Sequence, residues 1–351
     1  MAHPMTHQEK ERGQHSMKRL LTRGSAPTRT IRALAMLAAA ALSLSACGAA
    51  RVSDMASPGA KGSGQKCGTF NLAVNAWVGY AANAAVIAYL AKNKLGCTVN
   101  MKNLDEQVSW QGFSTGEIDA VVENWGHADL VKKYITEQKV ARDAGPTGNE
   151  GKIGWFVPPF LAKAHPDILE YQNLDKYADL FRTSESAGKG QLLDGDPGFV
   201  TNDAALVKNL KLNFKVVFSG SEAALIQSFR QAEQTKTPMI GYFYEPQWFT
   251  SEVPLVKVNL PKNTPGCDTD VAKVACDYPL YTLNKVVSNS FAKSGSPAFT
   301  LVKNFKWTNA DQNLVAKYIA EDKMPADKAA KKWVEANPDK VTAWLAGTGV
   351  S

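Results

Sequence analysis

Several aromatic residues of this sequence occur at spacings that suggest a binding site. Trp77 and Trp125 each follow a short apolar segment and each is followed closely by a glycine, while Trp155, Tyr244 and Trp248 accompany two later apolar segments. The face of an aromatic ring attracts cations, and a quaternary ammonium group, which cannot donate a conventional hydrogen bond, is bound mainly in this way. The set therefore predicts a cation site. The alternative is that these rings pack two parts of the chain together, and the pattern alone does not decide between the two.

Signatures of catalysis are missing from the sequence. It contains no Gly-x-Ser-x-Gly, no His-Glu-x-x-His and no phosphate-binding Gly-x-x-x-x-Gly-Lys segment. After residue 47 the histidines are His127 and His165, which provide little material for a His-based triad or a metal cluster. His127 directly follows the Trp125 turn and could line a crevice, but a structural role is more common for such a histidine. We predict no enzymatic activity, no cofactor and no metal.

Strands and helices alternate in the first half of the chain. Residues 70–74, 98–104 and 118–125 have the composition of strands, and 81–94 and 106–114 that of helices. Alternation of this kind predicts a parallel sheet, and ligands of open α/β sheets bind at the carboxyl ends of the strands, where Trp77 and Trp125 lie. A helix that begins near Gly79 and Tyr80 would also offer free amides to a carboxylate.

The second half of the chain indicates a second lobe and a return to the first. Residues 145–151 are rich in turn formers, and the apolar segment 153–160 with its paired prolines predicts an edge or crossing strand and a hinge. Strands are expected at 215–218, 239–244 and 255–260, and helices at 310–346, with Trp333 and Trp344 in the core. We predict lobe one at 66–157 plus 252–351 and lobe two at 158–251, an α/β fold of mostly parallel sheets flanked by helices.

The N-terminal segment predicts export and a lipid anchor. Of the formal charge of +7, most comes from residues 1–47, so the rest of the chain is nearly neutral and nucleic-acid binding is not expected. A basic stretch precedes an apolar run at 33–46 that ends Leu-Ser-Ala-Cys47, which resembles the bacterial lipobox, whose cysteine is lipidated; an ordinary cleavage site with a chance cysteine is the alternative. Met17 is a more typical signal start than Met1. Residues 48–66, rich in Gly, Ala and Ser, predict a flexible tether.

Four further cysteines, Cys67, Cys97, Cys267 and Cys276, predict disulfides in an exported protein. Three pairings are possible. Cys67 and Cys97 each precede a predicted strand, so they would be neighbours if those strands are parallel, and the other two bracket a polar loop. We favour Cys67 with Cys97 and Cys267 with Cys276. The rival, a zinc site, lacks a Cys-x-x-Cys spacing.

Beside these patterns, the order of several short motifs over residues 68–346 resembles the substrate-binding proteins of glycine betaine/choline/proline betaine ABC importers. The motifs are Asn-Ala-Trp77, Gly-Glu-Ile-Asp-Ala-Val-Val-Glu-Asn-Trp125, Gly-Trp155-Phe-Val-Pro-Pro, Tyr-Phe-Tyr244-Glu-Pro-Gln-Trp248, Ala-Ala-Lys-Lys-Trp333-Val-Glu-Ala-Asn and Val-Thr-Ala-Trp344-Leu.

This resemblance implies a two-lobe periplasmic-binding-protein clamp of type II, with Trp77, Trp125, Trp155 and Tyr244 as an aromatic box and Trp248 as a supporting residue. Family members usually have Trp-x-Pro-His-Trp where this chain has Tyr-Glu-Pro-Gln-Trp, so the usual contact with a ligand carboxylate is changed. Phe199 stands where some choline binders place a polar group. The ligand therefore stays open among glycine betaine, choline and proline betaine.

Taken together, the sequence predicts a solute-binding lipoprotein on the outer face of the cell membrane that delivers a quaternary ammonium solute to an ABC permease, with a role in osmoprotection. Two alternatives belong to other classes: a cell-surface lipoprotein hydrolase, which would need a nucleophile and base not visible here, and an envelope scaffold without a small ligand.

Overall fold

A computed structural model describes residues 67–199 and 201–350 of the chain. The predicted signal peptide, the lipidation site at Cys47 and the tether at 48–66 lie outside the described residues. Within the described part, no helix is both long enough and apolar enough to cross a membrane.

The N-terminal elements follow the predicted alternation of strands and helices. They are β1 (Thr69–Val74), α1 (Val78–Asn93), β2 (Thr98–Asn103), α2 (Glu106–Thr115) and β3 (Ala120–Asn124). Helix α1 begins directly after Trp77, three residues earlier than predicted. It is buried over most of its length, and alanines lie on several of its sides, where neighbouring elements can pack closely. Helix α2 ends where predicted, at Gly116, whose positive φ of 76° allows the left-handed turn.

One path of paired strands runs through the protein, in the order β2-β1-β3-β9-β4-β7-β5-β6, with β8 beside β4. The remaining strands are β4 (Ala141–Val157), β5 (Gly190–Asp194), β6 (Phe214–Phe218), β7 (Gly241–Glu245), β8 (Val256–Lys257) and β9 (Tyr281–Ser288). Strand β1 is parallel to β2 and β3, and β5 is parallel to β6 and β7. The central strands β9 and β4 are antiparallel to their neighbours. The strands β2, β1 and β3 on one side, and β7, β5 and β6 on the other, are parallel to one another.

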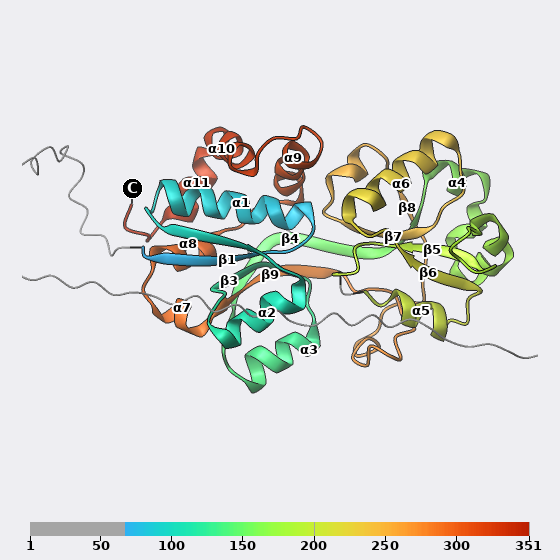
Figure 1. Cartoon of the computed structure of the whole chain (residues 1–351), viewed down its shortest axis with the longest axis horizontal. Coiled ribbons are helices and arrows are strands. Elements are labelled where there is room, and N and C mark those ends of the chain that lie inside the picture. Colours follow the sequence, from blue (N-terminus) through green and yellow to red (C-terminus); the bar gives the residue numbers. More distant parts are fainter. Residues whose placement is uncertain (1–66, 200, 351) are drawn as a thin grey trace, which may run out of the picture. The chain divides into compact units, whose positions relative to one another are not determined.

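Strand β4 belongs to both lobes. Its first part pairs with β9, from Ala141 to Gly151, and its last part pairs with β7, from Lys152 to Phe156; Figure 1 shows the strand running between the two groups of helices. We call β2, β1, β3, β9 and the start of β4 lobe one, and the end of β4 with β7, β5, β6 and β8 lobe two. The predicted residue boundaries of the lobes stay a prediction.

The interpretation of residues 145–151 as a turn-rich break was wrong. These residues continue β4, but its register against β9 shifts twice, around Pro146 and before Glu150. Gly145 and Gly148 have φ values of 93° and 90°, which only glycine adopts easily. Turn-forming residues therefore produce irregularities inside a strand here, because the partner strand β9 keeps the segment extended.

Helices flank the strands on both lobes. They are α3 (Ala128–Leu130), η1 (Val131–Glu137), α4 (Pro159–Ala164), η2 (Pro166–Leu169), η3 (Tyr171–Phe181), α5 (Asp203–Asn209), α6 (Glu222–Thr235), η4 (Trp248–Ser251), α7 (Asn289–Lys293), α8 (Pro297–Asn304), α9 (Asn309–Ala320), α10 (Ala326–Ala336) and α11 (Pro338–Leu345). Helices α9 and α10 pack against α1, so the end of the chain completes lobe one. The predicted core role of Trp333 and Trp344 is confirmed, since both are buried and their rings stack.

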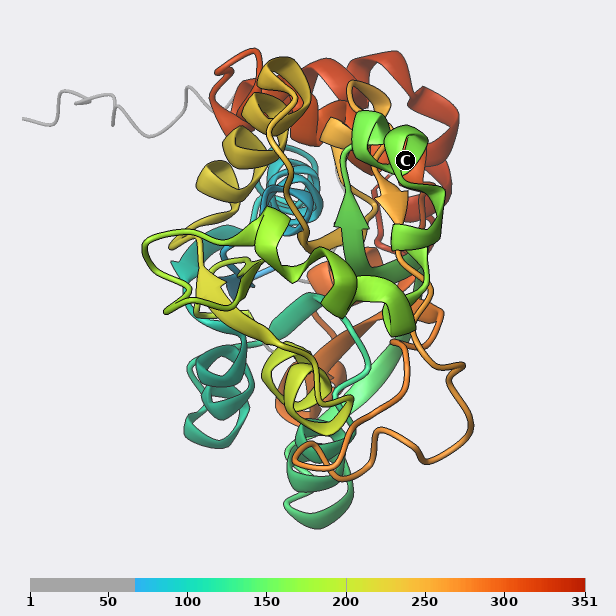
Figure 2. The same ribbon diagram turned by 90° about the vertical axis from the view of Figure 1, so that its right-hand side faces the viewer.

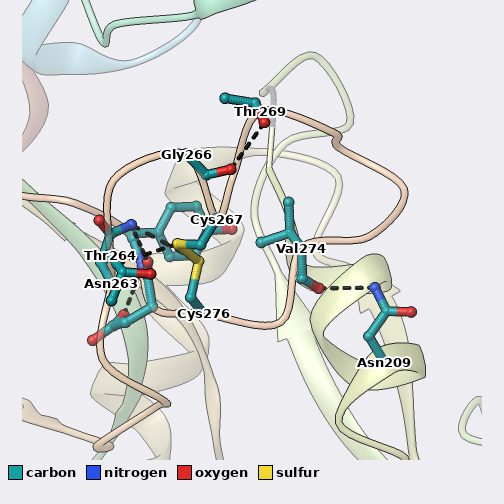
Figure 3. The surroundings of a disulfide bond; sticks show 10 residues. Asn209, Asn263, Thr264, Gly266, Cys267, Thr269, Val274 and Cys276 are labelled. Atoms are coloured by element: carbon teal, nitrogen blue, oxygen red, sulfur yellow. Dashed lines mark hydrogen bonds between the residues drawn. A yellow bond between two sulfur atoms is a disulfide. The ribbon is translucent and has the colours of Figure 1, made fainter.

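The segment between β8 and β9 forms a long loop with no regular element (orange in Figure 2). The structure pairs Cys267 with Cys276 inside this loop and Cys67 with Cys97 next to β1 and β2, as the sequence predicts. Figure 3 shows how the loop is held: Asn209 of α5 donates to the carbonyl oxygen of Val274 at 2.9 Å, and Thr269 donates to Gly266.

Candidate functional site

A cavity of about 330 Å³ lies at the ends of the strands, with walls from both lobes. Its size falls in the range of small-molecule sites. Its lining is rich in aromatic rings, which are Trp77, Trp125, Phe199, Tyr242, Tyr244, Tyr278 and Tyr281. Its polar and charged lining includes Glu106, Gln107, His127, Asp129, Thr201, Asn202, Asp268 and Thr269.

One buried carboxylate orients both predicted tryptophans of lobe one. The indole Nε1 atoms of Trp77 and Trp125 both donate to Oε1 of Glu123, at 2.7 and 2.9 Å. Trp77 follows shortly after β1, which ends at Val74, and Trp125 directly follows β3. These strands are parallel neighbours, so the two rings come from adjacent strand ends. Gly151 of β4 gives the Trp125 ring its space, since a Cβ there would lie 2.5 Å from it. The rings are therefore fixed before any ligand arrives.

The second oxygen of Glu123 is also satisfied. Asn83 of α1 and Gln312 of α9 donate to Oε2, the latter at 3.0 Å. Complete burial raises the pKa of Glu123 to about 7, while the donated hydrogen bonds, that of Trp77 first among them, oppose the rise. The site thus depends on the C-terminal helix α9, which the sequence predicts as a helix without indicating any role in the site.

Lobe two supplies the facing rings. Tyr244 of β7 meets Trp125 edge to face, with ring centroids 5.8 Å apart, and Phe199 meets Trp77 in the same way at 5.7 Å. Tyr242, two residues before Tyr244 on β7, also faces the cavity. The rings of the two lobes therefore enclose one space, and the predicted residues Trp77, Trp125 and Tyr244 lie together around it.

Glu222 connects the two lobes beside the cavity. Its Oε1 accepts hydrogen bonds from the Tyr244 hydroxyl and from Nε2 of Gln247, and its Oε2 accepts one from the backbone N–H of Val78 at 2.8 Å. Val78 is the first residue of α1, so the carboxylate lies where a helix N-terminus favours an anion. Gln247, at the position of the histidine usual in the family, is thereby engaged within the protein.

The amides predicted to meet a ligand carboxylate are not on the cavity lining. Gly79 is buried where a Cβ would lie 2.4 Å from Nε2 of Gln312, and Tyr80 is a core residue whose hydroxyl accepts a hydrogen bond from the backbone N–H of Val122. Neither residue is among those that line the cavity. The glycine is needed for close packing of α1 against α9.

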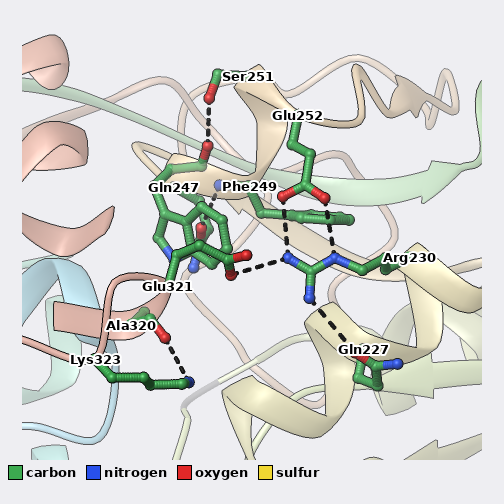
Figure 4. Close-up of polar contacts among 10 residues, drawn as sticks. Gln227, Arg230, Gln247, Phe249, Ser251, Glu252, Ala320, Glu321 and Lys323 are labelled. Atoms are coloured by element: carbon green, nitrogen blue, oxygen red, sulfur yellow. Dashed lines mark hydrogen bonds and ion pairs between the residues drawn. The ribbon is translucent and has the colours of Figure 1, made fainter. Parts of the chain in front are cut away.

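Trp155 and Trp248 also lie behind the cavity wall. Trp155 is 1% exposed and its indole donates to Asp203 at 2.9 Å; Asp203 in turn accepts from the Tyr278 hydroxyl, which faces the cavity. Trp248, the first residue of η4, packs near the guanidinium of Arg230 and against Phe249, whose ring contacts Phe243 of β7. Figure 4 shows that guanidinium between Glu252 and Glu321, the residue that follows α9.

Two lining tyrosines, Tyr278 and Tyr281, were not found from the sequence. Tyr278 lies at the end of the long loop, where residues follow neither the strand nor the helix period, and Tyr281 is the first residue of β9. The feature of the sequence that could have indicated Tyr278 is the cysteine pair just before it. A loop closed by Cys267 and Cys276 keeps its C-terminal side near α5, where the Tyr278 hydroxyl accepts a hydrogen bond from the backbone N–H of Asn202 at 2.7 Å.

Apart from His127, the charged residues of the cavity lining are acidic. Glu106, at the start of α2, is 4% exposed, and its Oε1 lies 2.9 Å from Nε2 of His127. Burial alone would lower the pKa of His127. The charge of Glu106, the hydrogen bond with Glu106 and the charge of Asp129 together outweigh burial and raise the pKa above its ordinary value. His127 therefore lines the crevice, but as the partner of a carboxylate.

The family described as the substrate-binding domain of ABC-type glycine betaine transport systems matches residues 68–336. The chain belongs to this family. The family comprises binding domains of transporters, which agrees with the prediction that the protein is not an enzyme. The described fold and the cavity at the strand ends thus belong to the solute-binding component of an ABC importer.

Relatives of known structure or function share this architecture. The trimethylamine N-oxide-binding protein of Pelagibacter ubique is 26% identical over 254 residues, which cover 69% of this chain and 80% of that protein. Lactococcal OpuAC, solved closed with glycine betaine, is 21% identical with a TM-score of 0.59, covering 79% of this chain and 99% of that one. A choline-binding protein of an ABC transporter, solved with choline, is 20% identical with a TM-score of 0.65, covering 80% and 92%. These structures confirm the two-lobe periplasmic-binding fold.

Proposed function

We propose that the protein captures a quaternary ammonium compatible solute outside the cytoplasm and delivers it to the permease of its ABC importer. The observation that carries the proposal is the pair of indoles, Trp77 and Trp125, held by one carboxylate oxygen of Glu123 at the wall of the cavity. Both N–H groups are taken up by that carboxylate, so what the rings offer a ligand is their π faces. Such faces suit a methylated ammonium group.

In this proposal the aromatic box consists of Trp77, Trp125 and Tyr244, with Phe199 as a further wall. Trp155 and Trp248 support it from behind: the first fixes Asp203, which holds the lining residue Tyr278, and the second packs on Phe249, whose ring contacts Phe243 of β7. The relatives that bind glycine betaine, choline and trimethylamine N-oxide make methylated ammonium compounds the first candidates.

The proposal includes a lipid anchor at Cys47, because the lipobox-like sequence ends there and a Gly/Ser-rich stretch follows. The protein would then stay at the outer face of the membrane beside its permease. We further propose that the two cysteine pairs are disulfides in the exported protein, since the structure brings both pairs to bonding distance.

Thermal-shift measurement with a panel of ligands tests the proposed function. Glycine betaine, choline, carnitine, proline betaine and trimethylamine N-oxide form the test set, and sugars and amino acids form the control set. We expect stabilisation by one or more members of the test set only. Stabilisation by the control set alone, or by no compound, would refute the proposal.

Calorimetry on ring variants tests the box itself. One cation–π contact contributes about 0.5–2 kcal/mol, so Trp125→Leu should weaken binding about tenfold, whereas Trp125→Phe should keep part of the affinity. Phe218→Leu is the matched control, because Phe218 is a half-exposed aromatic residue outside the cavity. Equal affinity of the parent and of Trp125→Leu would show that the rings only pack the lobes together.

A further inference from the structure

The charges that line the cavity are almost all of one sign. Among the described lining residues there are three carboxylates, Glu106, Asp129 and Asp268, and no lysine or arginine. The one lining group that can become positive is His127, and it lies at ion-pair distance from Glu106. With His127 neutral or protonated, the lining is therefore net negative.

The layer behind the aromatic rings is acidic too. Glu123 holds the indoles of lobe one, Glu222 holds the Tyr244 hydroxyl and Asp203 holds the Tyr278 hydroxyl. All three are buried, and burial raises the pKa of each. No described lysine or arginine donates to any of them; their partners are indoles, hydroxyls, amides and one backbone N–H. Where one of these carboxyls is ionised, a cation in the cavity would be its counter-charge.

Two groups beside the aromatic box that could receive a ligand carboxylate are engaged within the protein. The backbone N–H at the start of α1 donates to Glu222, and the amide of Gln247 donates to the same carboxylate and accepts from the N–H of Phe249. Like charges placed together repel, and this repulsion lowers the affinity for an anionic group. A ligand with a carboxylate would meet that repulsion in a cavity lined by Glu106, Asp129 and Asp268.

We infer that the cavity prefers methylated ammonium compounds of net positive charge, such as trimethylammonium alcohols, over zwitterionic betaines, and that Glu106 determines this preference. The inference rests on the proposed function, since it assumes a methylated ammonium group in the aromatic box. Glu106 is singled out because it is the most buried of the three lining carboxylates, and water screens its charge least. Its carboxylate can accept a hydrogen bond from a ligand hydroxyl or lie near the ligand's positive charge.

Choline and glycine betaine form a matched pair of probes, because they share the trimethylammonium group and differ in ending with a hydroxyl or a carboxylate. We would measure both dissociation constants by calorimetry, at fixed pH and ionic strength, on the protein extracted from cells in detergent. The parent protein should bind choline at least tenfold tighter than glycine betaine.

Glu106→Gln should then weaken choline binding while leaving glycine betaine binding unchanged or improved, and so reduce the preference about tenfold, the effect expected for one hydrogen bond to a charged group. Glu117→Gln is the matched control: Glu117 is exposed, just beyond the end of α2, and does not line the cavity. If Glu106→Gln does not fold, as judged by its unfolding transition, Asp268→Asn carries the same test and should shift the preference in the same direction.

The outcomes separate this inference from the proposed function. Binding of neither probe and of no other methylated ammonium compound would overturn the proposed function. Tighter binding of glycine betaine than of choline, or a preference that is unchanged in both Glu106→Gln and Asp268→Asn, would overturn the inference alone. So would a selective loss of glycine betaine binding in His127→Gln, because the imidazole would then be the receptor of a ligand carboxylate.

Discussion

Glu123→Gln should change how the stability of this protein depends on pH. Glu123 is fully buried, and burial raises its pKa from the ordinary value of 4.5 to about 7. The folded protein therefore binds this proton more tightly than the unfolded chain does. The resulting stabilisation is fully present below pH 4.5 and is lost as the pH rises through 7. A glutamine at this position cannot titrate, so the variant should lack this contribution.

The magnitude follows from the two pKa values. At about 1.4 kcal/mol for each pH unit, the difference between 4.5 and about 7 corresponds to roughly 3 kcal/mol in the free energy of unfolding. For a protein of this size that is a difference of roughly 5–10 °C in the unfolding temperature. Other buried carboxyls with raised pKa values, among them Glu222 and Asp203, are present in both proteins and cancel in the comparison.

Urea unfolding in steps from pH 4.5 to pH 8.5, followed by tryptophan fluorescence, would measure the effect. The parent should lose about 3 kcal/mol more than Glu123→Gln over this interval, whatever the difference between the two at the starting pH. Glu117→Gln, with an exposed carboxylate, should behave as the parent does. Parallel curves for the parent and Glu123→Gln would refute the reasoning, because the buried carboxylate would then not be the group that titrates.

Three further predictions follow from the proposals. Cys47→Ala should release the protein from the membrane fraction or leave an unprocessed precursor, and unchanged fractionation with unchanged mass would contradict the anchor. Peptide mapping without reduction should recover the two cysteine pairs of the structure, whereas links across the pairs or four free thiols would contradict them. Arg230→Met removes ion pairs with Glu252 and Glu321 and should lower the free energy of unfolding by about 1 kcal/mol in urea unfolding. Lys236→Met, which removes one ion pair with Glu233 of α6, is the control, and an equal effect of both would show that the two ion pairs of Arg230 stabilise the fold no more than that single pair does.

The lobes and the position of the site could be predicted from sequence because both depend on local patterns. Strand–helix alternation places Trp77 and Trp125 at neighbouring strand ends, and the two-residue period of β7 places Tyr242 beside Tyr244. The same reasoning could not separate lining rings from supporting ones. Trp155 lies on β4 among apolar neighbours like any strand residue, and only its hydrogen bond to Asp203, 48 positions away, shows that it faces away from the ligand space.

The polar partners of the site were missed for a related reason. Glu123 lies inside an apolar strand, Gln312 in a C-terminal helix and Glu222 at the start of α6, and no spacing relates them. Each becomes informative only when the fold brings it to an indole, a hydroxyl or a free N–H. The N-cap of α9 shows the same limit on a smaller scale: Thr308 and Asn309 are both residue types that favour this position, and only the structure shows that Thr308 forms a capping box with Asp311.

The hydrogen bond between Val78 and Glu222 makes one backbone amide a reporter of domain motion. Val78 belongs to a helix of lobe one, and its N–H has its acceptor on lobe two. When the lobes separate, that single proton becomes free to exchange with solvent, whereas the amides deeper in α1 keep their partners within the helix. Hydrogen exchange at Val78, measured with and without ligand, would thus read the opening equilibrium of the clamp directly from the natural chain, with no label attached.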